Sequence, residues 1–123
     1  MKRILMVEDN EMNRDALSRM LSIHGYDVTV AVDGPQGLEL AAANPPDLIL
    51  MDLGLPKIDG WECVRRLRLS LATRTIPIIA LTAHAMVGDR ERALNAGCDE
   101  FDTKPIDFAG LLEKMTRLLE PAA

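Results

Sequence analysis

The chain alternates between two patterns of hydrophobic positions. Short runs of apolar or β-branched residues are typical of buried strands, and apolar residues that recur every three or four positions are typical of amphipathic helices. The runs predict strands over residues 3–7, 27–32, 47–52, 76–82 and 99–103. The helical spacing predicts helices over residues 10–25, 34–44, 61–71, 86–96 and 107–119. Strand and helix therefore alternate five times along the chain.

Residues at the element ends support these boundaries. Asn10 and Asp107 are expected to cap the first and last helices, because their side chains can accept hydrogen bonds from free N–H groups. Gly25 is a typical helix stop, and Pro35 suits a first helical turn. Three helices have expected buried faces. These faces comprise Met12, Ala16, Leu17, Met20 and Leu21 in the first helix, Trp61, Val64, Leu67 and Leu71 in the third, where Arg65, Arg66 and Arg68 are expected in water, and Phe108, Leu111, Leu112, Met115, Leu118 and Leu119 in the last.

The alternation predicts an α/β protein of the doubly wound (βα)5 type, with a mainly parallel five-stranded sheet and helices on both faces. The 123 residues suffice for one domain, which we expect to span residues 1–123, and they contain no internal repeat or low-complexity linker. In open sheets of this kind, ligands bind beyond the carboxyl ends of the strands. Functional side chains are therefore expected at those ends.

Composition narrows the classes of function. With 19 acidic and 14 basic residues the net charge is -5, which argues against binding nucleic acid or an anionic membrane through the overall field. Cys63 and Cys98 lie far apart and form no CxxC or metal-binding pattern, so we expect two reduced thiols in a cytoplasmic protein. The apolar run at residues 4–7 is too short for a signal peptide or a membrane span.

Five polar side chains follow the predicted strands. Each has an ordinary explanation when taken alone, because acidic residues and threonines cap helices and lysines lie on surfaces. Their shared position at one edge of the sheet instead favours a common site, since parallel strands end side by side. The five residues are Glu8, Asp9, Asp52, Thr82 and Lys104.

The chemistry of these five side chains is complementary. Three carboxylates held close together repel one another unless a cation joins them, and an all-oxygen set suits Mg²⁺, which keeps several waters and shares a phosphate. Asp52 ends the central apolar run and can act as a nucleophile toward phosphorus. Lys104 supplies positive charge and Thr82 a hydroxyl donor for the phosphoryl oxygens. The residues therefore predict a site that accepts a phosphoryl group.

The sequence resembles the receiver domain of two-component response regulators, the CheY-like family, over essentially its whole length. Within that family it looks most like single-domain DivK-like proteins and the receivers of hybrid kinases, on the segments VEDNEMNRD and ALTAHAM. The resemblance implies a flavodoxin-like sheet with strand order 2-1-3-4-5. It rests on the motifs VEDN, DLILMDLGLP, DGWE, PIIALTA and KP, which arrive in the family's order.

The resemblance also assigns a role to each residue of the site. It implies that Asp52 is the phosphorylated aspartate and that Asp9 is a direct ligand of Mg²⁺, or of a related divalent cation such as Mn²⁺. Glu8 would reach the metal through water, and the backbone carbonyl of Gly54 would be a further metal contact. Gly54 and His84 occupy positions that modulate the lifetime of the phosphate, in a direction that the sequence leaves open. A surface histidine without such a role is the alternative for His84.

The family's switch is expected to involve three further positions. Thr82 resembles the switch hydroxyl and Lys104 the phosphate-binding lysine, with a cis peptide bond between Lys104 and Pro105. Phe101 stands where the family commonly has tyrosine, which presents a hydroxyl to a partner. We therefore expect a steric readout by Phe101 and by the face formed by the fourth helix, fifth strand and fifth helix. Phe101 as a plain core residue is the alternative.

The predicted function is a phosphorylation switch in a phosphorelay. A histidine kinase or histidine phosphotransfer protein would supply the phosphoryl group, and the output would be contact with a downstream protein, with no nucleic acid or membrane partner. We expect a monomer or weak dimer that is not a turnover enzyme. The chain fits a stand-alone receiver, and a receiver excised from a hybrid kinase would look similar.

Three other functions are alternatives to a phosphorylation switch. An aspartyl-phosphate phosphatase of the haloacid-dehalogenase type needs a second acid two residues after the nucleophile, where this chain has Gly54. A nucleotide-binding module needs a glycine-rich phosphate loop, and neither GxGxxG nor GxxxxGK[ST] occurs. An interaction domain that is no longer phosphorylated is the third, and the complete set of five site residues weighs against it.

Overall fold

The computed structural model describes residues 1–83 and 86–120, and it has the alternating order that the sequence predicts. The strands are β1 (Arg3–Val7), β2 (Asp27–Ala31), β3 (Leu48–Asp52), β4 (Ile78–Thr82) and β5 (Glu100–Thr103). The helices are α1 (Glu11–Ile23), α2 (Gly34–Ala43), α3 (Gly60–Leu69), α4 (Asp89–Ala96) and α5 (Phe108–Leu119). All strand pairs are parallel, in the order β2-β1-β3-β4-β5, which confirms the expected topology.

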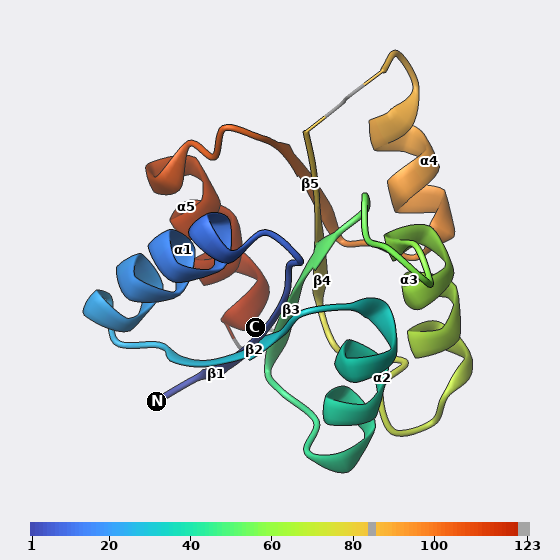
Figure 1. Cartoon of the computed structure of the whole chain (residues 1–123), viewed down its shortest axis with the longest axis horizontal. Helices are drawn as coiled ribbons and strands as arrows, with labels where there is room; N and C mark the ends of the chain where they lie inside the picture. Colours follow the sequence, from blue (N-terminus) through green and yellow to red (C-terminus); the bar gives the residue numbers. More distant parts are fainter. Residues whose placement is uncertain (84–85, 121–123) are drawn as a thin grey trace.

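The sheet separates two groups of helices. Helices α1 and α5 lie on one side, and α2, α3 and α4 lie on the other (Figure 1). Side chains of successive strand residues point to opposite faces, so each strand contributes to both cores. One core contains Leu5, Ile49, Met51, Ile78 and Ala80 with partners from α2, α3 and α4, and the other contains Ile4, Leu48, Leu50, Ile79 and Leu81 with partners from α1 and α5.

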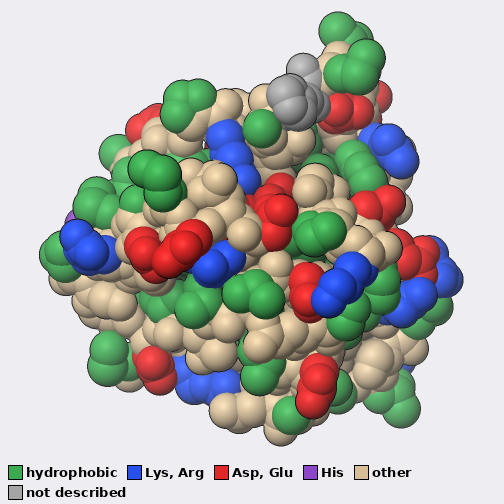
Figure 2. All heavy atoms as spheres, in the orientation of Figure 1, with side chains coloured by type: hydrophobic (Ala, Val, Ile, Leu, Met, Phe, Trp, Pro, Cys, Tyr) green, Lys and Arg blue, Asp and Glu red, His purple; other side chains and the backbone are tan. Residues whose placement is uncertain are grey.

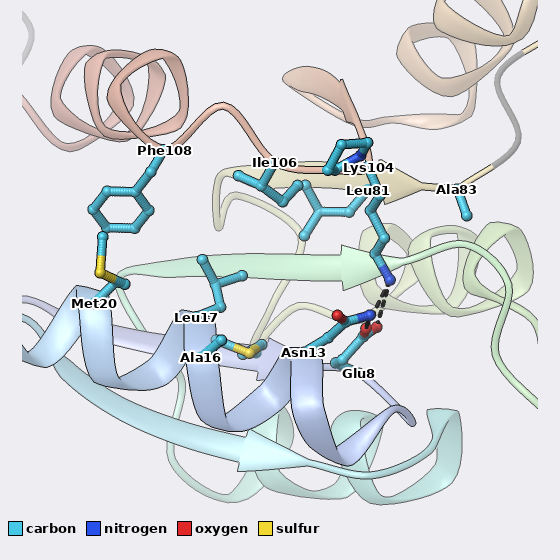
Figure 3. A pocket seen from close by; sticks show the side chains of 12 residues that line it. Glu8, Asn13, Ala16, Leu17, Met20, Leu81, Ala83, Lys104, Ile106 and Phe108 are labelled. Carbon is cyan, nitrogen blue, oxygen red and sulfur yellow. Dashed lines mark hydrogen bonds and ion pairs between the residues drawn. The ribbon is translucent and has the colours of Figure 1, made fainter.

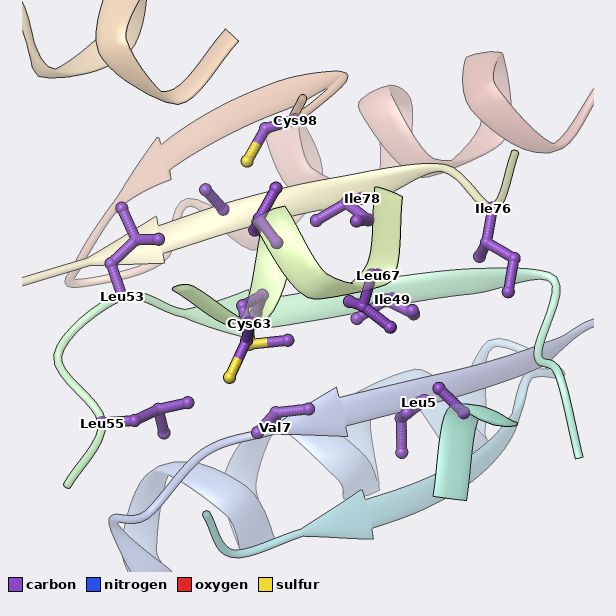
Figure 4. Packing of buried hydrophobic residues seen from close by; sticks show 14 of the residues in the cluster. Leu5, Val7, Ile49, Leu53, Leu55, Cys63, Leu67, Ile76, Ile78 and Cys98 are labelled. Atoms are coloured by element: carbon purple, nitrogen blue, oxygen red, sulfur yellow. The ribbon is translucent and has the colours of Figure 1, made fainter. Parts of the chain in front are cut away.

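The central strand β3 is buried at every position, from Leu48 to Asp52. The apolar packing continues beyond the strand through Leu53 and Leu55, which contact the same core as Cys63 (Figure 4). Burial of a leucine or isoleucine side chain contributes about 2 kcal/mol to folding. The segment that carries Asp52 is therefore anchored on both faces and along both edges.

Both cysteines are free and buried, as expected for two reduced thiols. Burial raises the pKa of Cys63 to about 11, and burial likewise raises the pKa of Cys98 to about 11. The thiolate form that reacts with oxidants and metals is therefore scarce at neutral pH. In this protein the two residues act as small apolar core side chains.

The end of α3 differs from the sequence prediction. The helix ends at Leu69, so Leu71 lies beyond it and is exposed instead of extending the buried stripe. Arg68, expected in water, is partly buried because its guanidinium donates to the carbonyls of Gly97 and Ile76, at 2.8 and 2.6 Å. A guanidinium that satisfies carbonyls of distant loops can leave the solvated face of a helix.

Three other helices also depart from prediction. Met12 was expected on the buried face of α1, yet its side chain is exposed. Helix α4 begins at Asp89 instead of residue 86, because Gly88 has a positive φ of 90° that ends any helix running through it. Asn10 caps α1 by accepting the N–H of Asn13, but Asp107 makes no side-chain hydrogen bond at the start of α5.

Candidate functional site

The three predicted acidic residues meet at the carboxyl edge of the sheet. Asp52 is the last residue of β3, and Glu8 and Asp9 directly follow β1. The parallel register pairs Val7 with Met51, so the two strands end level with each other. One carboxylate oxygen from each of the three side chains lies within 4.8 Å of the other two. Glu8 and Asp52 are buried, whereas Asp9 is exposed.

Lys104 approaches this cluster from the other side of β3. Its Nζ donates to both carboxylate oxygens of Glu8, at 2.7 and 2.9 Å (Figure 3). The same Nζ lies 3.4 Å from Oδ2 of Asp52. Its main-chain N–H donates to the carbonyl of Thr82 at 2.8 Å, which ties the end of β5 to that of β4. The peptide bond between Lys104 and Pro105 is cis. One ammonium group thus contacts two of the three acids.

The close packing of these charges shifts their protonation. Burial and the hydrogen bond with Asp52 raise the pKa of Glu8 to about 7, even though Lys104 and Asn13 act to lower it. Burial would also raise the pKa of Asp52, but hydrogen bonds from Glu8 and from the Gly54 N–H, together with the charge of Lys104, outweigh burial and lower it. Asp52 is therefore ionised at neutral pH, as a nucleophile must be.

The loop after β3 holds Asp52 through its main chain. The N–H of Gly54 donates to Oδ1 of Asp52 at 3.0 Å, and the N–H of Gly60 donates to the carbonyl of Leu53 at 3.2 Å. A Cβ at Gly60 would lie 2.3 Å from the carbonyl oxygen of Asp52. Only glycine permits so close an approach, so the start of α3 packs directly on the backbone of Asp52.

The remaining predicted residues lie around this centre. Thr82 is partly buried at the carboxyl end of β4 and pairs in register with Thr103. Phe101 is buried in β5, on the side of the sheet that faces α3 and α4. His84, predicted to modulate phosphate lifetime, lies outside the described residues.

Two residues of the site were missed by sequence reasoning. Asn13 donates from Nδ2 to Oε1 of Glu8 at 2.8 Å, and Nη1 of Arg14 donates to the main-chain carbonyls of Glu8 and Asp9 at 3.1 and 2.9 Å. Both residues belong to the first turns of α1, and neither was assigned a role from the sequence. The available signal was their position one helical turn after two acidic residues.

The donor set fits a hard divalent cation. All three side chains offer oxygen, and their ligand atoms are close enough to share one ion. Oxygen ligands with carboxylate charge favour Mg²⁺, Mn²⁺ or Ca²⁺ over softer metals such as Zn²⁺. The carboxyl edge of the sheet can therefore hold a cation beside a negatively charged ligand.

A five-stranded parallel sheet in this order, with an acidic cluster and a lysine at its carboxyl edge, defines a flavodoxin-like α/β protein of the CheY-like type. The chain belongs to the response regulator receiver domain family, whose pattern it matches over residues 4–116. Receiver domains are regulatory parts of two-component systems and interact with histidine kinases or histidine phosphotransfer proteins. This confirms the family and the fold that the sequence motifs predicted.

Individual relatives place the chain within this family. It is 38% identical over 121 residues to the polar-differentiation response regulator DivK of Brucella ovis, covering 98% of both chains. It is 41% identical over 119 residues to the DNA-binding dual master transcriptional regulator RpaA of Synechocystis. The chain spans about half the length of RpaA and of the similar response regulators MprA from Mycobacterium.

Solved structures agree with this placement. The receiver domain of sensor histidine kinase PA1611 from Pseudomonas aeruginosa, which contains a magnesium ion in its active site cleft, has a TM-score of 0.89 and 42% identity, over 96% of this chain and 97% of that one. The chemotaxis protein CheY4 of Vibrio cholerae has a TM-score of 0.90 and 28% identity, over 97% of this chain and 99% of that one. Within the described residues, no helix is long and apolar enough to cross a membrane.

Proposed function

We propose that this receiver is a phosphorylation switch in which Asp52 accepts a phosphoryl group from a phosphohistidine. The observation that carries the proposal is the position of Asp52, which ends the buried strand β3 among Glu8, Asp9 and Lys104. The donor would be a histidine kinase or a histidine phosphotransfer protein. This chain would supply the acceptor oxygen and the electrostatic environment for the transfer.

The transfer is a single displacement at phosphorus. A carboxylate oxygen of Asp52 forms a P–O bond while the P–N bond to the donor histidine breaks, and the leaving imidazole nitrogen takes up a proton from solvent. The negative charge of the transferred group needs positive charge and hydrogen-bond donors near its oxygens. Lys104 and the hydroxyl of Thr82 supply them, the former by exchanging its contacts with Glu8 for contacts with the phosphoryl group.

The site would hold Mg²⁺, or Mn²⁺ in its place. Asp9, Asp52 and the backbone carbonyl of Gly54 would be direct ligands, and Glu8 would act through a bound water. When bound, the cation neutralises negative charge shared by the carboxylates and the phosphoryl oxygens. The support for this assignment is the convergence of three carboxylate oxygens within 4.8 Å and the magnesium ion in the related PA1611 receiver.

The readout would begin at Thr82 and Phe101. Movement of Thr82 toward the phosphoryl group would vacate space that Phe101 fills, and Phe101 has no hydroxyl to present to a partner. The shape of the face formed by α4, β5 and α5 would then change and alter contact with a downstream protein. Gly54 and His84 are the candidates for setting how long the phosphate persists.

We further propose that residues 1–123 form one receiver domain that works as a monomer or weak dimer in the cytoplasm, where kinases have ATP. Its output would be protein contact without turnover of a substrate. Acidic and basic side chains are interspersed on the face shown in Figure 2, and the net charge of -5 fits a protein partner better than nucleic acid.

Intact-mass measurement after incubation with Mg²⁺ and a small acyl phosphate tests the proposal. We expect one phosphoryl adduct on the wild-type protein, none on Asp52→Asn, and an unchanged adduct on Asp15→Asn, which alters an exposed aspartate of α1. A folded wild-type protein without an adduct would show an unphosphorylated interaction domain. Sustained hydrolysis of phosphate monoesters would show a phosphatase.

A further inference from the structure

We infer that Asn13 and Arg14 are positioning residues that preset the acidic pair Glu8–Asp9 for its cation. The inference rests on the proposed function, because it concerns the same metal site. Neither side chain is expected to touch the cation or the phosphoryl group. Their effect would be exerted through Glu8 and Asp9, whose side chain and backbone they hold.

Arg14 holds the backbone of the acidic pair. One guanidinium nitrogen donates to the carbonyls of both Glu8 and Asp9, at 3.1 and 2.9 Å, and the side chain is partly buried. Hydrogen bonds from a charged donor are stronger than neutral ones, so this contact restricts the two residues between β1 and α1. The direction in which the Asp9 carboxylate leaves the backbone is fixed by that restriction.

Asn13 holds the side chain of Glu8. Its amide nitrogen donates to Oε1 of Glu8 at 2.8 Å, and the same oxygen accepts from Lys104 at 2.7 Å (Figure 3). Asn13 is itself fixed, because its main-chain N–H donates to the side chain of Asn10 at 3.0 Å. Two consecutive residues of α1 therefore restrain the same acidic pair in complementary ways.

These contacts exceed what helix α1 needs for its own start. Asn10 already caps the helix, and the main-chain N–H of Arg14 already donates to the carbonyl of Asn10 at 2.9 Å. The guanidinium of Arg14 instead reaches back to residues that precede the helix. Because it binds carbonyls, it brings positive charge near the cluster without occupying a carboxylate oxygen that the cation needs.

A preset ligand pair should matter most for a small cation. Mg²⁺ requires near-ideal octahedral geometry, whereas Ca²⁺ accepts flexible arrangements. Loss of an outer residue that orients metal ligands typically weakens metal binding 10- to 100-fold. We expect Arg14→Ala to weaken Mg²⁺ binding about tenfold and Ca²⁺ binding less. Asn13→Ala should cause a smaller loss, because Lys104 still contacts Glu8.

The test uses the full chain and measures metal binding directly. Free Mn²⁺ is followed by electron paramagnetic resonance, and Mg²⁺ and Ca²⁺ are measured by competition against Mn²⁺. Arg19→Ala is the matched control, since Arg19 lies on the same helix, is exposed, and makes no hydrogen bond or ion pair within the described residues. Low-millimolar guanidinium should restore most of the Mg²⁺ affinity of Arg14→Ala, while equal sodium chloride should not.

The outcomes separate the inference from the proposed function. Selective loss of Mg²⁺ affinity with rescue by guanidinium supports the positioning role. Wild-type and Arg14→Ala proteins that bind Mg²⁺ equally would overturn it and leave the metal site intact. Equal weakening of Mg²⁺ and Ca²⁺ without rescue would also overturn it, by showing a general structural defect. Failure of the wild-type protein to bind Mn²⁺ or Mg²⁺ would overturn the metal site itself, and the inference with it.

Discussion

The two sides of the carboxyl edge are built differently. On the acidic side, Asn10 caps α1 with its side chain, and the connection from β3 to α3 buries Leu53 and Leu55 and places Gly60 against the backbone of Asp52. On the opposite side, α4 has only eight residues and begins after Gly88, which has no side chain to cap it. The first side is thus restrained by a helix cap, by buried leucines and by a close backbone contact.

Helix α4 has a sparser set of contacts than the acidic side. Ala93 is its buried residue, and Met86 and Val87 before it expose apolar side chains to solvent. Arg92 stacks over the ring of Trp61 in α3, with 4.1 Å between the guanidinium carbon and the ring centroid. The comparison teaches that the three acidic residues lie on the closely packed side and that a change of shape is easiest to accommodate on the α4 side.

The largest expected effect on stability comes from a pair of glycine-to-alanine variants, one on the acidic side of the carboxyl edge and one on the α4 side. Gly60→Ala should lower the free energy of unfolding by about 3 kcal/mol, because its Cβ would lie 2.3 Å from the Asp52 carbonyl and overpacking of this kind is costly. Gly88→Ala should cost about 1 kcal/mol, since its positive φ is strained for alanine but, chain neighbours aside, no atom of the described residues lies within 4 Å of the added Cβ.

Urea unfolding at neutral pH measures both variants. The wild-type protein is the reference, and equal slopes with denaturant would show that the unfolded states are comparable. Equal losses of stability in Gly60→Ala and Gly88→Ala would contradict the contrast between the two sides. A larger loss in Gly88→Ala would reverse it.

A smaller effect concerns the protonation of Glu8. Its pKa of about 7 in the folded protein exceeds the ordinary value of 4.5, so the folded protein binds more protons than the unfolded chain between these values. Stability contributed by Glu8 is therefore present below pH 4.5 and is lost as the pH rises through 7. The metal-free protein should lose on the order of 2 kcal/mol from this residue between pH 5 and pH 8.

The matched variant is Glu8→Gln, which has no charge to titrate. Its unfolding free energy should fall less than that of the wild-type protein over the same pH range. Added Mg²⁺ should reduce the loss in the wild-type protein, because the cation favours ionised Glu8. Parallel pH profiles of the two proteins in chelator would contradict the assigned pKa.

The smallest expected effect is on the α4 side. Arg92→Ala removes the contact with Trp61 and should cost about 0.5 kcal/mol, as exposed cation–π pairs do. Trp61 is the single tryptophan of the chain, so its fluorescence reports the change directly. A loss above about 2 kcal/mol would show that α4 is held as firmly as the acidic side.

The sequence was sufficient to predict the strands and their order along the chain, because continuous apolar runs such as residues 48–51 have few other structural uses. It was insufficient where a residue's partners are distant in sequence. Arg68 looked solvated on its helix, yet it binds the carbonyls of Ile76 and Gly97. Leu71 continued the helical period after the helix had ended, since periodicity does not record where the backbone turns.

The residues of the candidate site likewise divide into those that the sequence could predict and those that it could not. Glu8, Asp9, Asp52 and Lys104 were predictable because each stands at a strand end, and parallel strands end at one edge. Their support was not, because the contacts of Asn13 and Arg14 depend on the path between β1 and α1 and on side-chain rotamers. Polar residues on a first helical turn look identical to solvated ones in a sequence.

Because β3 is fully buried, the direction in which the Asp52 side chain points depends on the number of strand residues that precede it. Side chains alternate between the two faces of a strand, so deletion of one residue from 48–51 would exchange the two core faces and turn the carboxylate away from Glu8. An insertion in an exposed turn of the chain would leave that count unchanged. The exposed loops can therefore change in length without disturbing the site, whereas the number of residues from the start of β3 to its terminal aspartate must stay the same.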